Sequence, residues 1–140
     1  MAENLGLIVT HGDLGAELVR LAELILGPEQ ELTSLSNRGF SGSALQDRVQ
    51  KWLAGSLGAP DQGAIVFVDD YGGSCATAVR LASRNRRDVA ILTGVNLAMI
   101  LGFLTWRNAL SLNDLARKLV EVGRGAINRI ETQADGGDSA

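Results

Sequence analysis

The feature that most limits the possible folds of this chain is a continuous apolar run, Gly63-Ala64-Ile65-Val66-Phe67-Val68. An uninterrupted run of this length is typical of a parallel strand that helices cover on both faces. The run ends in a polar loop that contains two glycines, and a helical pattern of apolar residues follows the loop. This strand–loop–helix unit indicates an α/β domain.

The same unit occurs four times along the sequence. The predicted strands are centred on residues 7–9, 32–35, 63–68 and 89–92, and the predicted helices cover 14–26, 43–55, 74–82 and 97–104, with a last helix beginning at Ser111. Strands that alternate with helices of this length are joined by right-handed crossovers. We therefore expect an α/β fold with a doubly wound, mainly four-stranded parallel sheet and helices on both faces.

Composition excludes several classes of protein. The 140 residues suit one domain, 46% of them are hydrophobic, and no apolar run approaches the roughly 18 residues of a membrane-spanning helix. The net charge is −3 and the basic cluster Arg84–Arg87 is short, so we expect neither a nucleic-acid partner nor direct membrane insertion. A single cysteine, Cys75, cannot form an internal disulfide, and the amino terminus has no signal-peptide pattern. These features predict a cytoplasmic protein.

His11, the only histidine, follows the first predicted strand. Open parallel sheets bind ligands at the carboxyl ends of their strands, and His11, Asp69 and Thr93 each follow a strand and are expected at that edge. A carboxylate such as Asp69 can hold one imidazole nitrogen and leave the other free to attack. The alternative for a lone histidine is a structural role, with the ring bonded to a backbone carbonyl.

The turn Gly72-Gly73-Ser74 stands before a predicted helix, which Ser74 can cap. Backbone amide groups in such a turn suit an anion with several oxygens. The turn lacks the lysine of a P-loop, and neither a dinucleotide fingerprint nor the G-x-S-x-G elbow of a serine hydrolase is present. We expect Cys75 to be a buried small residue rather than an activated thiol.

Three motifs together resemble a known family. They are Ile8-Val9-Thr10-His11-Gly12 before a helix, Val68-Asp69-Asp70-Tyr71-Gly72-Gly73-Ser74, and Thr93-Gly94-Val95-Asn96-Leu97 before Met99. Their order and spacing resemble those of the mannose-type enzyme IIA domain of the bacterial phosphoenolpyruvate:sugar phosphotransferase system, from Leu5 to about Ile130. The resemblance implies a carrier domain over residues 1–131, followed by a polar tail over 132–140 that we expect to be disordered.

The resemblance also implies roles for individual residues. His11 would receive a phosphoryl group from phospho-HPr and pass it to an enzyme IIB during sugar uptake. Asp69 would orient the imidazole, and Ser74 would lie by the phosphate, with Gly72, Gly73 and Thr10 as further phosphate-binding candidates. We expect no metal and no cofactor, because donor and acceptor are both protein side chains and the sequence shows no ligand cluster.

Two residues depart from the family pattern, because Cys75 and Ala98 stand where the family usually has proline. Neither change removes a phosphate-contacting group, so we expect the transfer chemistry to be kept, whereas the resemblance indicates the choice of partner less firmly. Two alternatives stay open: a regulatory protein that reports phosphotransferase flux without a cognate permease, and the phosphoryl donor of a dihydroxyacetone kinase, whose motif resembles Ser-His-Ser more than Thr-His-Gly.

The resemblance further implies a homodimer in which a carboxyl-terminal segment pairs with the partner's sheet. Residues 123–127 occupy the corresponding region, and their two glycines weaken a helix by about 1 kcal/mol each relative to alanine. We expect the last helix to end after Val122, which leaves residues 123–127 free to be exchanged. The alternative is that the helix continues to Ile130 within its own subunit.

Overall fold

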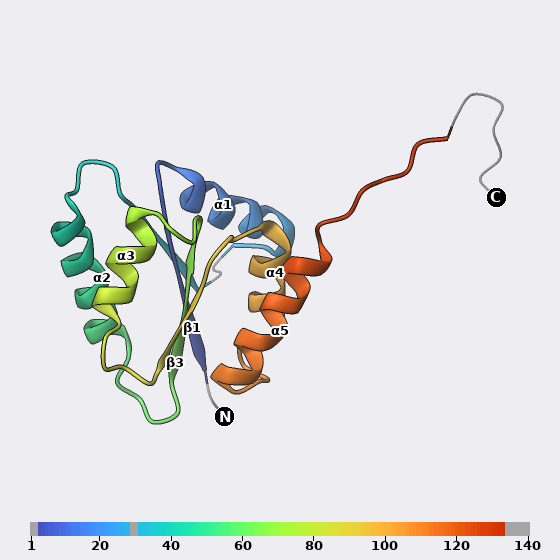
Figure 1. Ribbon diagram of the computed structural model, residues 1–140. Coiled ribbons are helices and arrows are strands. Elements are labelled where there is room, and N and C mark those ends of the chain that lie inside the picture. Colours follow the sequence, from blue (N-terminus) through green and yellow to red (C-terminus); the bar gives the residue numbers. More distant parts are fainter. Residues whose placement is uncertain (1–2, 29–30, 134–140) are drawn as a thin grey trace.

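The computed structural model describes residues 3–28 and 31–133 (Figure 1). Strands and helices alternate until the last two helices. In chain order the elements are β1 (Asn4–Thr10), α1 (Leu14–Leu26), β2 (Leu32–Ser36), α2 (Gly42–Ser56), β3 (Gly63–Val68), α3 (Ser74–Ala82), β4 (Val89–Leu92), α4 (Leu97–Trp106) and α5 (Leu112–Gly125).

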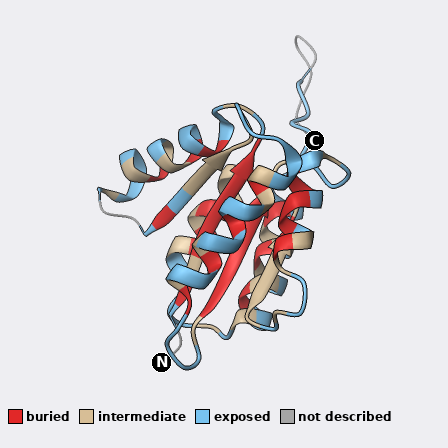
Figure 2. Cartoon of the chain, turned by 90° about the vertical axis from the view of Figure 1, so that its left-hand side faces the viewer, coloured by how far each residue is buried: buried red, intermediate tan, exposed pale blue. Residues whose placement is uncertain are grey.

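The four strands form one parallel sheet in the order β2-β1-β3-β4. The two central strands are buried almost throughout, and all six residues of β3 are buried (Figure 2). Helices α2 and α3 cover one face, and α1, α4 and α5 cover the other (Figure 1). The doubly wound fold predicted from the sequence is therefore confirmed.

Alternation along the central strands divides the core into two layers. Val66 and Val68 pack toward α2 and α3, whereas Ile65 and Phe67 pack toward α1, α4 and α5. Phe67 meets Phe103 of α4 edge to face, with ring centroids 5.5 Å apart. The continuous apolar run of β3 thus reflects a strand that supplies both layers.

Several boundaries differ from the sequence-based expectation. The side chain of Ser41, not Ser43, caps α2 by accepting a hydrogen bond from the Ala44 amide. Gly73, not Ser74, is the N-cap of α3, and Ser74 is the first helical residue. The sequence pattern places a cap only to within two positions, because several serines and glycines stand near both helix starts and both types suit the N-cap.

The last helix also ends later than expected. Ser111 caps α5 as predicted, but the helix runs past Val122 to Gly125. Gly123 fits because its missing side chain admits Met99, whose Cγ would lie 2.7 Å from a Cβ at this position. Packing thus outweighs the low helix propensity of glycine. Of the predicted tail, residues 132 and 133 have neither helix nor strand, and residues 134–140 lie outside the described residues, as do residues 1 and 2 of the predicted domain.

No helix in the described ranges is both long and apolar enough to cross a membrane.

Gly6 in β1 lies at a close contact between the sheet and α4. A Cβ at Gly6 would lie 2.7 Å from both Leu32 Cδ1 and Phe103 Cε2. We therefore expect Gly6→Ala to lower the free energy of unfolding by about 1–3 kcal/mol through overpacking. Urea denaturation would measure this, with Gly55→Ala as the control, because a Cβ at that helical position meets nothing within 4 Å. Equal stability of Gly6→Ala and the unmodified protein would contradict the packing argument.

Candidate active site

The pairing of β1 with β3 brings the two central polar residues of the site together. Val9 lies opposite Val68 in the parallel register, so both strands end at the same edge of the sheet. His11 begins the loop after β1, and Asp69 is the first residue after β3. The sequence-based prediction that these residues meet at the carboxyl edge of the sheet agrees with this geometry.

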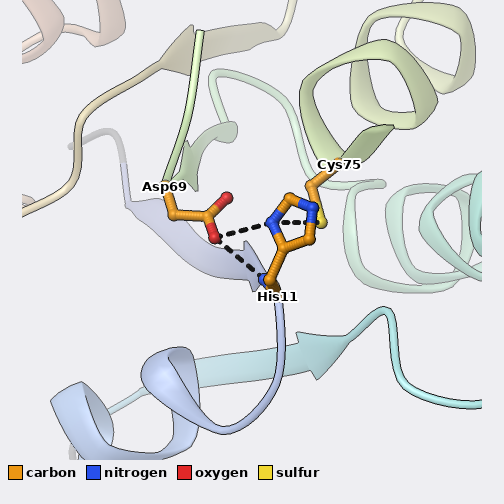
Figure 3. A group of neighbouring side chains, drawn as sticks. All are labelled: His11, Asp69 and Cys75. Atoms are coloured by element: carbon orange, nitrogen blue, oxygen red, sulfur yellow. Dashed lines mark hydrogen bonds and ion pairs between the residues drawn. The ribbon is translucent and has the colours of Figure 1, made fainter. Parts of the chain in front are cut away.

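One carboxylate oxygen of Asp69 holds both the backbone and the ring of His11 (Figure 3). Asp69 Oδ2 accepts a hydrogen bond from the His11 backbone N–H at 2.9 Å and lies 2.9 Å from His11 Nδ1. Because an ionised carboxylate only accepts, a neutral imidazole carries its proton on Nδ1 in this contact. The other nitrogen, Nε2, is then unprotonated and nucleophilic.

The charge of Asp69 is maintained by the same contacts. Partial burial alone would raise the pKa of Asp69, but the hydrogen bonds from the backbone and ring of His11 outweigh burial and lower the pKa below its ordinary value of 3.8. The side chain is 15% exposed, compared with 47% for His11. Asp69 is thus a partly buried anion that holds the Nδ1 side of the His11 ring, and the rest of the ring is exposed to solvent.

The amino-terminal turn of α3 faces the nucleophilic nitrogen. Ser74 Oγ lies 3.3 Å from His11 Nε2. Gly73 allows this approach, since a Cβ there would lie 3.2 Å from His11 Cε1. The amide groups in the first turn of α3 have no intrahelical acceptor, and no side chain caps the helix. Gly72 belongs to the exposed turn before Gly73, and a Cβ at Gly72 would meet nothing within 4 Å.

Thr10 lies apart from this group in the structure. Its side chain is fully buried, and its hydroxyl accepts a hydrogen bond from the Gly15 N–H at 2.8 Å. The hydroxyl therefore secures the start of α1. Strand alternation explains the outcome, because neighbouring residues at the end of a strand point in opposite directions.

The sequence analysis overlooked Asn37, which supports the loop that carries His11. Asn37 Oδ1 accepts a hydrogen bond from the Gly12 N–H at 3.1 Å, and Gly12 has a φ of +58°, a conformation that favours glycine. Arg38 forms an ion pair with Asp13 across the same loop at 3.2 Å. The sequence signal for Asn37 and Arg38 was the polar segment after β2. Which residues they bond to depends on the tertiary structure and is not visible in the sequence.

The third motif, after β4, has a structural role in this arrangement. Asn96 caps α4 by accepting from the Met99 amide, and its Nδ2 donates to the carbonyl of Gly123 in α5. Thr93 lines a separate groove together with Arg124 of α5. Thr93 thus follows a strand at the predicted edge but is not part of the group around His11.

The two departures from the family pattern both lie in first turns of helices. Cys75 is the second residue of α3, and Ala98 is the second residue of α4. Proline is tolerated in a first turn because the amide there has no intrahelical acceptor. Replacement of proline at these positions therefore leaves both helices intact.

Cys75 is fully buried, as the sequence analysis predicted, but it also contacts the site. Its Sγ lies 3.8 Å from His11 Nδ1 (Figure 3). Burial, together with the negative charge of Asp69, raises the pKa of the Cys75 thiol to about 11. The thiol is therefore protonated and unreactive near neutral pH. The sequence shows no ligand cluster, but in the folded chain the ligand-type side chains of His11, Asp69 and Cys75 lie close together.

Comparison with protein families gives one match over most of the chain. The model described as "PTS system fructose IIA component" matches residues 6–120. The fructose-specific EIIA component of the phosphotransferase system (PTS) of Bacillus subtilis is 32% identical over 116 residues, which cover 81% of this chain and 77% of that protein.

Two further comparisons agree with this match. The mannose-specific EIIAB component of Escherichia coli K12 is 26% identical over 90% of this chain, which spans only 39% of that relative's length. The mannose/sorbose-specific IIA subunit of Enterococcus faecalis superposes with a TM-score of 0.83 at 19% identity, covering 94% of this chain and 98% of that structure. The structural likeness concerns the fold.

Proposed function

Because this chain belongs to the EIIA-man family of PTS components, we propose that it carries a phosphoryl group on Nε2 of His11. The observation that supports this proposal is the 2.9 Å contact between His11 Nδ1 and Asp69 Oδ2, which directs the unprotonated Nε2 away from the carboxylate. A nitrogen held in this way is a competent nucleophile at the exposed edge of the sheet.

The proposed reaction exchanges one phosphorus–nitrogen bond for another. Nε2 of His11 attacks the phosphorus of phospho-HPr in line, and the electron pair of the breaking bond returns to the donor nitrogen. The proton on His11 Nδ1 stays in the contact with Asp69, which stabilises the positive charge that the ring gains. In the second transfer an enzyme IIB attacks the phosphorus on His11 in line, and the electron pair of the breaking bond returns to Nε2.

Ser74 and the turn before it would balance charge on the transferred group. Ser74 Oγ lies only 3.3 Å from His11 Nε2. Its hydroxyl can therefore turn from Nε2 toward an oxygen of a phosphoryl group carried on that nitrogen. Amide groups at Gly73, Ser74 and Cys75 supply donors at the positive end of the α3 dipole. Positioning and electrostatic stabilisation of this kind account for most of the catalysis in phosphoryl transfer.

Incubation with phosphoenolpyruvate, enzyme I and HPr tests the proposal by intact mass measurement. We expect a gain of one phosphoryl group that acid removes, and its loss again when the cognate enzyme IIB is added. Omission of HPr is the control and should prevent labelling. Labelling without any enzyme IIB accepting the group would support the regulatory alternative, and no labelling would contradict a carrier role. A carrier of this kind works in the cytoplasm beside its soluble partners.

We also propose that the chain forms a homodimer through the segment after α5. Strand β4 lies at one edge of the sheet, and exposed edges readily accept a further strand. Beyond Gly125 the chain leaves the body of the domain (Figure 1), and its Ile127 and Ile130 are 79% and 86% exposed. Two apolar side chains on an extended segment suit pairing with the sheet of a second copy.

Light scattering at micromolar concentration tests the dimer. We expect the full chain to be dimeric and a chain ending at Gly125 to be monomeric, because the truncation removes the exchanged segment but keeps α5. A chain ending at Glu131 is the control and should remain dimeric. A monomeric full chain would contradict the dimer, and a dimer that survives truncation at Gly125 would contradict the exchange.

A further inference from the structure

The side chains of His11, Asp69 and Cys75 bring one nitrogen, one oxygen and one sulfur atom close together. In the part of the chain that the structure describes, these three donor atoms lie within 4.8 Å of one another. They come from three elements, since His11 follows β1, Asp69 follows β3 and Cys75 belongs to α3 (Figure 3). The phosphoryl-transfer chemistry uses the first two residues and has no need of the thiol.

The donor set indicates which ion the cluster suits. Zn²⁺ binds imidazole nitrogen, carboxylate oxygen and thiolate sulfur, at about 2.0–2.3 Å. Tetrahedral geometry with those lengths places ligand atoms about 3.3–3.6 Å apart. The contacts from His11 Nδ1 are 2.9 Å to Asp69 Oδ2 and 3.8 Å to Cys75 Sγ, and no two of the three ligand atoms are more than 4.8 Å apart. Side-chain rotations that move the carboxylate and the sulfur up to about 1 Å closer together would bring all three separations to those distances. Mg²⁺ and Ca²⁺ require several oxygen ligands, which this cluster does not provide.

We propose that His11, Asp69 and Cys75 bind Zn²⁺ through three side chains, with a fourth position open to water, and that bound zinc blocks phosphorylation of His11. Three protein ligands and an open position are the arrangement of an accessible zinc site rather than a closed structural one. The binding rests on the geometry of the three residues alone, whereas the block also rests on the proposed phosphoryl-carrier function.

The block follows from the single proton of a neutral imidazole. Zinc takes the lone pair of Nδ1, so the proton that Nδ1 carries in the contact with Asp69 must move to Nε2. A protonated Nε2 has no lone pair with which to attack phosphorus. The thiol of Cys75 releases its proton to solvent when sulfur binds the metal. The ring, the carboxylate and the metal then form a unit in which His11 cannot act as a nucleophile.

Metal titration of the full chain tests the site without phosphoryl transfer. Competition against a chromophoric chelator should show one Zn²⁺ per chain, and Co²⁺ should give the near-ultraviolet charge-transfer band of a thiolate ligand. Cys75→Ala should lose the band and weaken Zn²⁺ binding by at least about tenfold, as expected for a lost ligand. Cys75→Ser serves as a second variant, and circular dichroism confirms that both are folded.

Asp70→Asn is the matched control, because this neighbouring carboxylate is exposed and stands outside the cluster. It should bind Zn²⁺ as tightly as the unmodified chain. Equal zinc affinity of Cys75→Ala and the unmodified chain, or a cobalt complex without the thiolate band, would overturn the site.

The block is measured with purified phospho-HPr as the donor, so that zinc cannot act on enzyme I. Each protein is compared with itself in the presence of Zn²⁺ and of a chelator. Zinc should slow phosphorylation of the unmodified chain at least about tenfold and have a much smaller effect on Cys75→Ala, since the second protein remains largely free of metal. Zinc-loaded protein that is phosphorylated at the full rate would overturn the block. A chain that accepts no phosphate even with chelator would contradict the phosphoryl-carrier function, and the metal titrations would still decide the site.

Discussion

Replacing His11 with alanine is expected to abolish phosphorylation while leaving the domain folded. The imidazole is half exposed and its removal opens no cavity in the core, so the free energy of unfolding should change little. Because His11 is the only histidine in the chain, no second imidazole can take the phosphoryl group. Intact mass measurement after incubation with the phosphorelay would show an unmodified protein.

The comparison requires equal folded fractions of both proteins, which circular dichroism and urea denaturation establish. His11→Gln is a second variant that keeps much of the side-chain volume and should also remain unlabelled. If either variant gained an acid-labile phosphoryl group at the rate of the unmodified chain, His11 would not be the acceptor.

Replacing Asp69 with asparagine is expected to slow phosphorylation by about 10²-fold or more. An asparagine amide can donate to Nδ1, which would place the imidazole proton on Nε2, where it prevents attack. The neutral side chain also fails to stabilise the positive charge that develops on the ring. Rapid-quench measurement of the transfer from phospho-HPr would report the change in rate.

Asp70→Asn provides the matched control for this prediction. The substitution is chemically identical and one residue away, but Asp70 is exposed and its side chain has no hydrogen bond to His11 in the described structure. We expect its transfer rate to stay close to that of the unmodified chain. Equal rates for Asp69→Asn and Asp70→Asn would exclude an orienting role for Asp69.

Strand and helix positions were largely predictable because they depend on local apolar patterns. The run over β3 has the predicted limits, and β4 agrees likewise, since continuous apolar residues bounded by polar ones leave little choice. The end of α5 was predicted wrongly because the glycines there were judged by propensity alone. Met99 fills the space beside Gly123, and a contact with another helix is invisible in a local pattern.

The pairing of His11 with Asp69 was predictable from the sequence, but the contacts of the residues around this pair were not. His11 and Asp69 each follow a strand, and parallel strands bring such residues to one edge. The burial of Thr10 was not predictable, because a small polar residue beside a candidate functional one looks the same in the sequence whether it faces solvent or the core. The approach of Cys75 to the ring depends on how α3 is seated on the sheet, which no spacing in the sequence specifies.

The site joins residues that lie 58 and 63 positions apart in the chain, across the pairing of β1 with β3 and the seating of α3. Contacts of such long range form slowly, because loop-closure entropy must be overcome before they form. Phosphorylation by phospho-HPr would therefore measure folding. During refolding the chain would accept a phosphoryl group only after β1, β3 and α3 had assembled. On the proposed function, an incompletely folded copy would therefore accept no phosphoryl group from phospho-HPr.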